Sequence, residues 1–284
     1  MTHTFPFLQI DVFTRQAGYG NPVAVVLDRE RVLDGDAMQR FAHWTNLSET
    51  VFMLPLDATS EVKGYELRIF TPSEELPFAG HPTVGSAHAA LHWGVVQPGE
   101  FVQRCGLGVI PISGSLEDGV SVRVARPELL DVQVSGEQLE RVLGLAAESP
   151  MLLDVGPRWI VAAIESVDAL YAIDPDPMEL AAFESAHSPA SGTTLYALDE
   201  QGAPHVRSFA PLHGIREDPV CGSGNLCVGE HLRLRGSRGA GDTWTARQGR
   251  ALGRDGHVQI TLLEDGALLG KSATILIEGT LSYP

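Results

Sequence analysis

The sequence predicts an α+β protein with two pseudo-symmetric domains, each a curved or barrel-like sheet wrapped around one central helix. Two observations carry this prediction. Short strand-like runs dominate both halves of the chain, and one motif occurs twice, about half of the 284-residue length apart. Each copy has a strand ending in Arg-x-Phe-x-Pro, an acidic loop, a glycine-rich turn and a helix of small and apolar residues. The copies run from Arg68-x-Phe70-x-Pro72 to Ala79-Gly80-His81, and from Arg207-x-Phe209-x-Pro211 to Cys221-Gly222-Ser223.

The first half begins with strands and contains two helices of different kinds. Apolar runs predict strands at 7–13, 23–27, 50–54, 65–70, 101–103, 108–113 and 120–125. A helix is expected at 34–45, with Met38, Phe41, Ala42 and Trp44 on one side. The helix at 84–93 is small or apolar nearly all round, which predicts that every side of it is buried.

The second half repeats this pattern. Helices are expected at 135–143, opened by Ser135 as N-cap with Gln138 three residues on, at 178–187 and at 226–235. Strands are expected at 157–164, 193–197, 206–209, 243–248, 257–262 and 267–277. The pattern restarts after Arg126-Pro127-Glu128, so we predict domains at 1–127 and 128–274, with a last strand, 275–284, packing back onto the first domain. A single irregular α+β domain is the alternative.

Composition excludes several classes of function. The net charge is −16 and no Lys/Arg cluster offsets it, so nucleic acid and anionic membranes are not expected partners. The chain starts without a basic, apolar leader, and no apolar run reaches the length of a bilayer span. The three cysteines fit neither a disulfide framework nor a metal-ligand spacing, which favours a reducing cytoplasm. Nothing in the sequence requires a metal or a cofactor.

Glu49 lies between apolar neighbours at the start of a predicted strand. Loss of solvation raises the pKa of such a carboxyl group, which makes Glu49 a candidate general acid/base near neutral pH. A carboxylate that only caps the strand edge is the alternative, and from the residues alone it is the stronger one.

The two glycine-rich turns precede helices, and a helix N-terminus presents unpaired backbone amides and a partial positive charge. A small carboxylate substrate could therefore bind there, in a site between two facing helix N-termini. His81, in the first turn, could donate a hydrogen bond or relay a proton, or it could serve only as a helix cap.

Three residues of the second turn have open roles. Asp218 and Ser223 could each cap the helix or face a ligand. Cys221 could act as a base or nucleophile, because a thiol at a helix N-terminus has a lowered pKa. An inert small residue is the stronger reading, because the equivalent position in the first copy is Ala79 and a two-thiol racemase would need a thiol there.

With these residues in hand, the sequence resembles the PhzF-like (phenazine biosynthesis) family, which has a diaminopimelate-epimerase-like fold. The resemblance covers nearly the whole chain and rests on several motifs in order. They are Gly20-Asn21-Pro22-Val23-Ala24-Val25, Asn46-Leu47-Ser48-Glu49-Thr50, Arg68 to Pro72, Phe78 to Thr83, Glu217 to Gly224, and Gln248 to Arg254.

The resemblance implies a cofactor-free isomerase that moves a proton in a small cyclic amino or hydroxy acid, bound in a cleft between the domains. The family's acid/base glutamate matches Glu49, and its supporting site residues match His81, Asp218 and Ser223. The amides of Gly80, Gly222 and Ser223 would hold the substrate carboxylate, with Asn21 and Cys221 also lining the site. Homodimers are common in the family and are expected here.

One departure keeps a second reading open. The phenazine-type motif usually has Thr where this chain has Cys221, whereas diaminopimelate epimerases and proline racemases carry Cys there. The chain could therefore be a racemase, epimerase or dehydratase that uses Cys221. A non-catalytic binder of small acids on the same fold is the third reading, because fold does not fix function.

Overall fold

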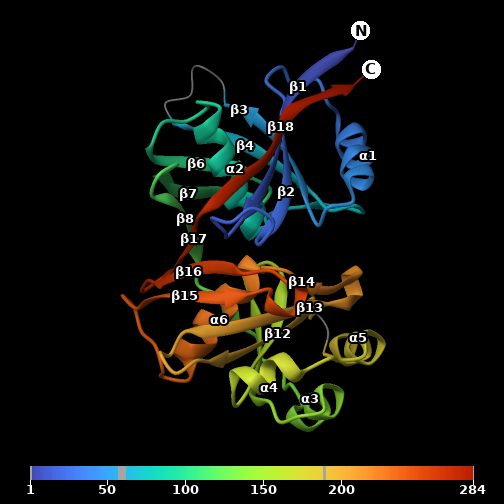
Figure 1. The fold of residues 1–284 in the computed structure, drawn as a ribbon, viewed down its shortest axis with the longest axis vertical. Helices are drawn as coiled ribbons and strands as arrows, with labels where there is room; N and C mark the ends of the chain where they lie inside the picture. The colour runs from blue at the N-terminus through green and yellow to red at the C-terminus, as the bar shows by residue number, and fades with distance from the viewer. Residues whose placement is uncertain (1, 57–61, 188–189, 284) are drawn as a thin grey trace. The chain divides into compact units, whose positions relative to one another are not determined.

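The computed structural model describes residues 2–56, 62–187 and 190–283. The chain divides into two compact units (Figure 1). Unit 1 comprises Met1–Arg123 with Gly270–Pro284, and unit 2 comprises Val124–Leu269. The chain passes from one unit to the other within two strands, β8 (Gly119–Ala125) and β17 (Gly266–Lys271).

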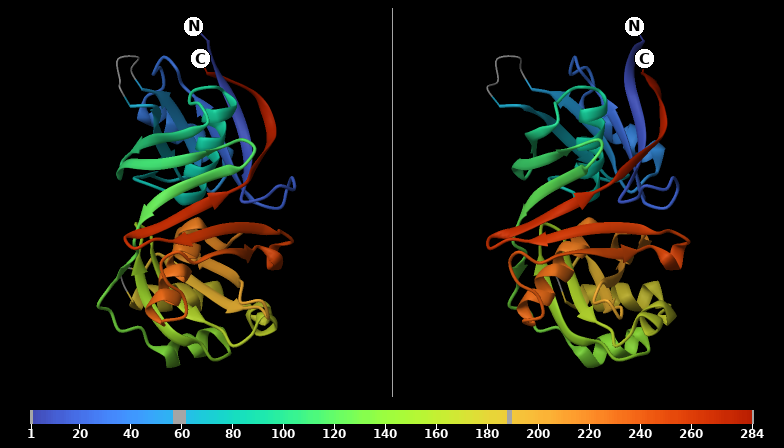
Figure 2. Two further views of the ribbon diagram at one scale, coloured as in Figure 1. Left: turned by 90° about the vertical axis from the view of Figure 1, so that its left-hand side faces the viewer. Right: turned by 60° about the vertical axis from the view of Figure 1, so that its left-hand side comes forward.

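Unit 1 is a curved sheet around helix α2 (Gly80–His92), and helix α1 (Gly35–Thr45) packs on its outer side (Figures 1 and 2). Its other strands are β1 (His3–Val12), β2 (Asn21–Leu27), β3 (Thr50–Pro55), β4 (Gly64–Phe70), β5 (Glu75–Leu76), β6 (Gly99–Cys105), β7 (Gly108–Ser115) and β18 (Ala273–Tyr283). The pairing order is β18–β1–β2–β3–β4–β6–β7–β8, antiparallel except for β2–β3 and β4–β6. Helix α2 contacts β1, β2, β3, β4, β7 and β18, so the sheet wraps around it.

Unit 2 has the same plan around helix α6 (Gly222–Leu234). Its other strands are β9 (Glu128–Leu129), β10 (Glu148–Asp154), β11 (Arg158–Ala163), β12 (Gly192–Leu198), β13 (Pro204–Ala210), β14 (Ile215–Asp218), β15 (Thr243–Gln248) and β16 (Gly256–Leu262). The outer helices are α3 (Gly136–Leu143), α4 (Val167–Ala172) and α5 (Pro177–Ala186), and short 3-10 turns lie at η1 (Pro211–His213) and η2 (Arg250–Leu252). The pairing order is β9–β10–β11–β12–β13–β15–β16, with β11–β12 and β13–β15 parallel.

The duplicated motif is duplicated in structure as well. Strand β4 pairs antiparallel with β3 and parallel with β6, and β13 pairs in the same way with β12 and β15. Arg68 forms a two-point ion pair with Glu75 and lies over the Phe70 ring at 5.1 Å. Arg207 forms the same contacts with Glu217 and with the Phe209 ring at 4.9 Å. The two units are therefore pseudo-symmetric, as the repeat predicts.

The two central helices are buried along nearly their whole length, which confirms the prediction made from their small, apolar sequences. Every residue from Gly80 to Leu91 of α2 is buried. Gly85 lets this helix approach β2, because a Cβ atom there would lie 2.6 Å from Val23 Cγ1. Small side chains thus allow one helix to occupy the interior of a tightly curved sheet.

The outer helices follow ordinary capping rules. Asp34 caps α1 by accepting a hydrogen bond from Ala37 N (2.8 Å), and Ser135 caps α3 by accepting one from Gln138 N (3.3 Å). Helix α1 covers a cluster that includes Met38, Phe52 and Phe70. Trp44 was predicted on the same side of this helix as Met38, but it does not join the cluster. It is 78% exposed and stacks on Phe41.

Several predicted boundaries differ from the structure. Both central helices begin four residues earlier than predicted, because the glycine-rich turns form their first helical turn. The run predicted as one strand at 267–277 is two strands, β17 and β18, since Lys271 takes a positive φ of 137° at the break. Strands β5, β9, β10 and β14 and helix α4 were not predicted. No helix among the described residues is both long and apolar enough to cross a bilayer.

Candidate active site

The predicted site residues gather into two clusters, one in each unit. Unit 1 brings together Asn21, Glu49 and His81, with Gly80 beside His81 at the start of α2. Unit 2 brings together Asp218, Cys221, Gly222 and Ser223 at the start of α6.

Glu49 and His81 form the centre of the unit 1 cluster. Glu49 lies directly before β3, and His81 is the second residue of α2. His81 Nε2 lies 3.3 Å from Glu49 Oε2, and the two side chains are 6% and 14% exposed. Burial raises the pKa of the Glu49 carboxyl to about 7, against a smaller lowering effect of a hydrogen bond from Ser48. A carboxyl group with this pKa can both accept and return a proton at neutral pH.

Asn21 connects His81 to the start of β2. Its amide Nδ2 lies 3.5 Å from His81 Nδ1, and both side chains are buried. An amide N–H that donates to Nδ1 leaves the ring hydrogen of neutral His81 on Nε2, the nitrogen that lies 3.3 Å from Glu49 Oε2. The preceding loop is fixed by Asp11, whose Oδ2 accepts hydrogen bonds from Gly18 N (2.7 Å) and Gly20 N (3.1 Å).

The first turn of α2 is held from the neighbouring strand. Gln103 on β6 donates from Nε2 to Thr83 Oγ1 (3.0 Å) and accepts from the Tyr65 hydroxyl (3.2 Å). Thr83 in turn donates to the carbonyl oxygen of Ala79, the N-cap residue, which offers no capping side chain. The helix therefore begins at Gly80, and the backbone amides of a first helical turn have no acceptor four residues earlier in the same helix.

In unit 2 a glutamine on the following strand also holds the start of the central helix, through different partners. Gln248 on β15 accepts hydrogen bonds at Oε1 from Cys221 N (3.1 Å) and Asn225 Nδ2 (2.8 Å), and donates from Nε2 to Asp218 O (3.1 Å). Gln248 lies in one of the family motifs but had no predicted role, and Gln103 was not predicted. Both glutamines lie on the strand that follows a central helix, so comparison of the two repeats could have found them.

Cys221 is the N-cap of α6. Its Sγ accepts a hydrogen bond from Gly224 N (3.3 Å), and the residue is 4% exposed. Burial, and secondarily the charge of Asp218, raises the pKa of the Cys221 thiol far above its usual range. The thiol therefore stays protonated at neutral pH, which disfavours a role as base or nucleophile.

Asp218 and Ser223 form hydrogen bonds with groups outside the N-terminal cap of α6. Asp218 Oδ1 accepts from Val220 N (3.0 Å) and so shapes the turn before α6. Ser223 Oγ accepts from Trp159 Nε1 (3.0 Å) and lies 3.5 Å from Cys221 Sγ. Neither Asp218 nor Ser223 caps α6, because the Cys221 thiol holds that position. Trp159 was not predicted from the sequence.

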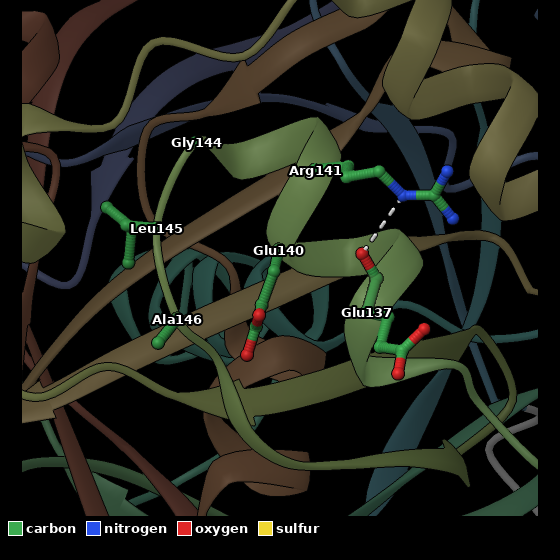
Figure 3. A pocket seen from close by; sticks show the side chains of 6 residues that line it. All are labelled: Glu137, Glu140, Arg141, Gly144, Leu145 and Ala146. Carbon is green, nitrogen blue, oxygen red and sulfur yellow. Dashed lines mark hydrogen bonds between the residues drawn. The ribbon is translucent and has the colours of Figure 1, made fainter.

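A surface pocket lies outside these clusters. Figure 3 shows an open surface pocket at the end of α3, lined by Glu137, Glu140, Arg141, Gly144, Leu145 and Ala146. Two of its side chains are carboxylates, so it does not suit an acidic substrate, and Arg141 Nε donates to the Glu137 carbonyl (3.3 Å). Within residues 2–56, 62–187 and 190–283, no group of three or more His, Cys, Asp or Glu side chains is placed to hold a metal ion.

Solved structures identify the fold. The chain matches a phenazine biosynthesis protein of the PhzF family from Bacillus anthracis with a TM-score of 0.83 at 23% identity, covering 98% of this chain and 99% of that one. A hydroxyproline epimerase from Agrobacterium vitis matches with a TM-score of 0.66 at 13% identity, covering 98% of this chain and 92% of the other. The fold is therefore of the diaminopimelate-epimerase-like class.

Sequence comparison gives the family. The model of the family described as phenazine biosynthesis-like protein matches residues 10–280, so the chain belongs to this family. Antisense-enhancing sequence 1 of Schizosaccharomyces pombe is 33% identical, with 90% of each chain covered. A trans-2,3-dihydro-3-hydroxyanthranilate isomerase of Pseudomonas aeruginosa is 32% identical, with 87% of each chain covered. The family resemblance predicted from the motifs is confirmed, and the chain is an isomerase of this family.

Proposed function

We propose that the protein isomerises a small cyclic amino or hydroxy acid without a cofactor, with Glu49 carrying a proton from one ring carbon to another. The observation that carries the proposal is the buried pair of Glu49 and His81, 3.3 Å apart, in which the Glu49 pKa is raised to about 7. Such a group is poised between its two protonation states at neutral pH, as proton return requires.

The reaction needs one carboxylate in two steps. The Glu49 carboxylate removes a proton from the substrate carbon and becomes a neutral acid, and the same acid then protonates a second carbon of the delocalised anion. Atoms and charge are conserved, so no redox partner or metal is part of the proposal. His81, whose Nδ1 contacts Asn21, would keep its Nε2 beside the Glu49 carboxylate, where it could exchange a proton with that group.

Substrate binding is assigned to the helix N-termini. The backbone amide of Gly80 at the start of α2 in unit 1, and those of Gly222 and Ser223 at the start of α6 in unit 2, would each favour a carboxylate, since a helix N-terminus favours an anion. These local donors are what an acidic protein of net charge −16 needs in order to bind an acid. Asp218 would orient a polar group of the substrate.

The substrate proposal draws on the relatives. The enzyme of Pseudomonas aeruginosa is named for trans-2,3-dihydro-3-hydroxyanthranilate, a cyclic amino acid, and the Agrobacterium vitis epimerase was solved with trans-4-hydroxy-L-proline bound. Both compounds are small ring acids that carry a hydroxyl group and a nitrogen. We therefore propose this substrate class, with the first compound as the initial substrate to test.

The test compares two variants at the two candidate proton carriers. Turnover of trans-2,3-dihydro-3-hydroxyanthranilate would be followed by ultraviolet absorbance with wild type, Glu49→Gln and Cys221→Ser. We expect Glu49→Gln to lower kcat by about 10²-fold or more, and Cys221→Ser to keep kcat within about threefold, because a hydroxyl can replace the thiol as N-cap. Equal losses in both variants would refute the assignment and favour Cys221 chemistry. Binding without turnover in wild type would favour a non-catalytic role.

A further inference from the structure

We propose that Trp159 is a positioning residue of the unit 2 cluster: its indole N–H holds the oxygen of Ser223 so that the Ser223 hydroxyl donates its own hydrogen to the substrate carboxylate. The inference rests on the proposed function and adds a residue that the family motifs do not contain. It is carried by the pseudo-symmetry of the two units, by one hydrogen bond and by a glycine.

Register identifies which positions correspond in the two units. Thr50 on β3 pairs with Phe70, and Thr193 on β12 pairs with Phe209. The residues just before them, Glu49 and Gly192, are therefore equivalent. His81 and Ser223 are equivalent too, since each is the second residue of its central helix. Where unit 1 has a Glu49–His81 contact, unit 2 has a glycine and a serine.

Trp159 occupies the space that the missing side chain leaves. It pairs with Gly192 across β11 and β12. A Cβ atom at position 192 would lie 2.6 Å from Cζ3 of the indole and 2.4 Å from the Phe209 carbonyl oxygen, so only glycine fits there. The indole then reaches the central helix, and its Nε1 lies 3.0 Å from Ser223 Oγ. The Glu49–His81 contact of unit 1 is replaced by a Trp159–Ser223 contact in unit 2.

The direction of this hydrogen bond decides what Ser223 can do. An indole N–H is only a donor, and Trp159 is 5% exposed, so it needs a buried acceptor. The Ser223 oxygen is that acceptor, which leaves the hydroxyl hydrogen for another partner. The Cys221 thiol at 3.5 Å is a weak partner, and a carboxylate oxygen is a much stronger one. Ser223 would therefore join the amides of α6 as a donor to an anion.

The test is a double-mutant cycle between Trp159→Phe and Ser223→Ala, read as the affinity for anthranilate, an unreactive ring amino acid. Phe keeps most of the ring volume and removes the N–H donor. We expect Trp159→Phe to weaken binding by about fivefold to tenfold in the wild-type background, and to have no effect once Ser223 is Ala. Additive losses, or wild-type affinity in Trp159→Phe, would overturn the proposal. Trp44→Phe, at an exposed position, is the matched control and should bind as wild type.

Two further readouts separate a positioning role from a structural one. In turnover assays Trp159→Phe should raise KM and leave the apparent pKa of kcat unchanged, because the Glu49 cluster is intact. In ¹H–¹⁵N spectra, Ser223→Ala should shift the indole resonance of Trp159 even without ligand. If anthranilate fails to bind wild type, the proposed substrate class fails, and an unmoved indole resonance in Ser223→Ala would then overturn the Trp159 proposal on its own.

Discussion

Replacing Glu49 by Gln should stabilise the protein at high pH and not at low pH. The folded state raises the pKa of the Glu49 carboxyl from 4.5 to about 7, because burial penalises its charged form. Between these values the unfolded chain has released the proton and the folded chain still holds it, so stability falls as pH rises. The difference corresponds to about 3 kcal/mol above pH 7 and to nothing below about pH 4.5. The side chain is 14% exposed, so solvent screens this cost only weakly.

Urea unfolding at pH 4.5, 6, 7 and 8 would measure this effect. The unfolding free energy of Glu49→Gln should equal that of wild type at pH 4.5 and exceed it by up to about 3 kcal/mol at pH 8. A second buried carboxyl, Glu184, also has its pKa raised to about 7 by burial, but its contribution cancels in the comparison. Glu100→Gln, at an exposed position, is the control and should show no pH-dependent difference. A pH-independent difference, or a loss of stability at pH 8, would refute the reasoning.

Four other outcomes are expected. The kcat/KM of wild type should rise with pH through an apparent pKa of about 7, as Glu49 loses its proton, and a flat profile from pH 5 to 8 would contradict this. The Cys221 thiol should resist iodoacetamide at pH 7.5 in the folded protein, because burial raises its pKa; rapid labelling seen by mass spectrometry would speak against it. Gln248→Leu should lower the unfolding free energy by about 1–3 kcal/mol, since it leaves Cys221 N unpaired and removes one of the two acceptors of Asn225 Nδ2, and an unchanged urea midpoint would exclude that role. Gly192→Ala should lower the melting temperature, because its Cβ would clash with Trp159 and with the Phe209 carbonyl; normal melting would show that the site relaxes.

The repeat made the plan of the fold predictable from sequence. Two Arg-x-Phe-x-Pro strands followed by glycine-rich turns imply two copies of one unit, and the uniformly small helices imply burial on all sides. The predicted starts of the two central helices are too late, because Gly and Pro usually indicate a loop. Here Pro82 lies in the first turn of α2, where a missing N–H costs no helical hydrogen bond.

Other features depend on contacts between residues distant in sequence. Trp44 has helical spacing with buried neighbours, yet it is exposed in the structure. The role of Trp159 depends on a glycine across the strand pair and on a serine in a later helix, and no local pattern reports either. The proposal of Glu49 rather than Cys221 as proton carrier also draws on the structure, because burial raises the pKa of the Glu49 carboxyl to about 7 and raises that of the Cys221 thiol far above its usual range.

The most direct test of the central claim is proton NMR in D₂O with trans-2,3-dihydro-3-hydroxyanthranilate and a panel of cyclic and linear amino and hydroxy acids. The account predicts that deuterium enters a carbon position of at least one cyclic acid with wild type, and that this exchange is lost in Glu49→Gln and kept in Cys221→Ser. Exchange that survives in Glu49→Gln, or that is lost only in Cys221→Ser, would contradict the assignment of proton transfer to Glu49.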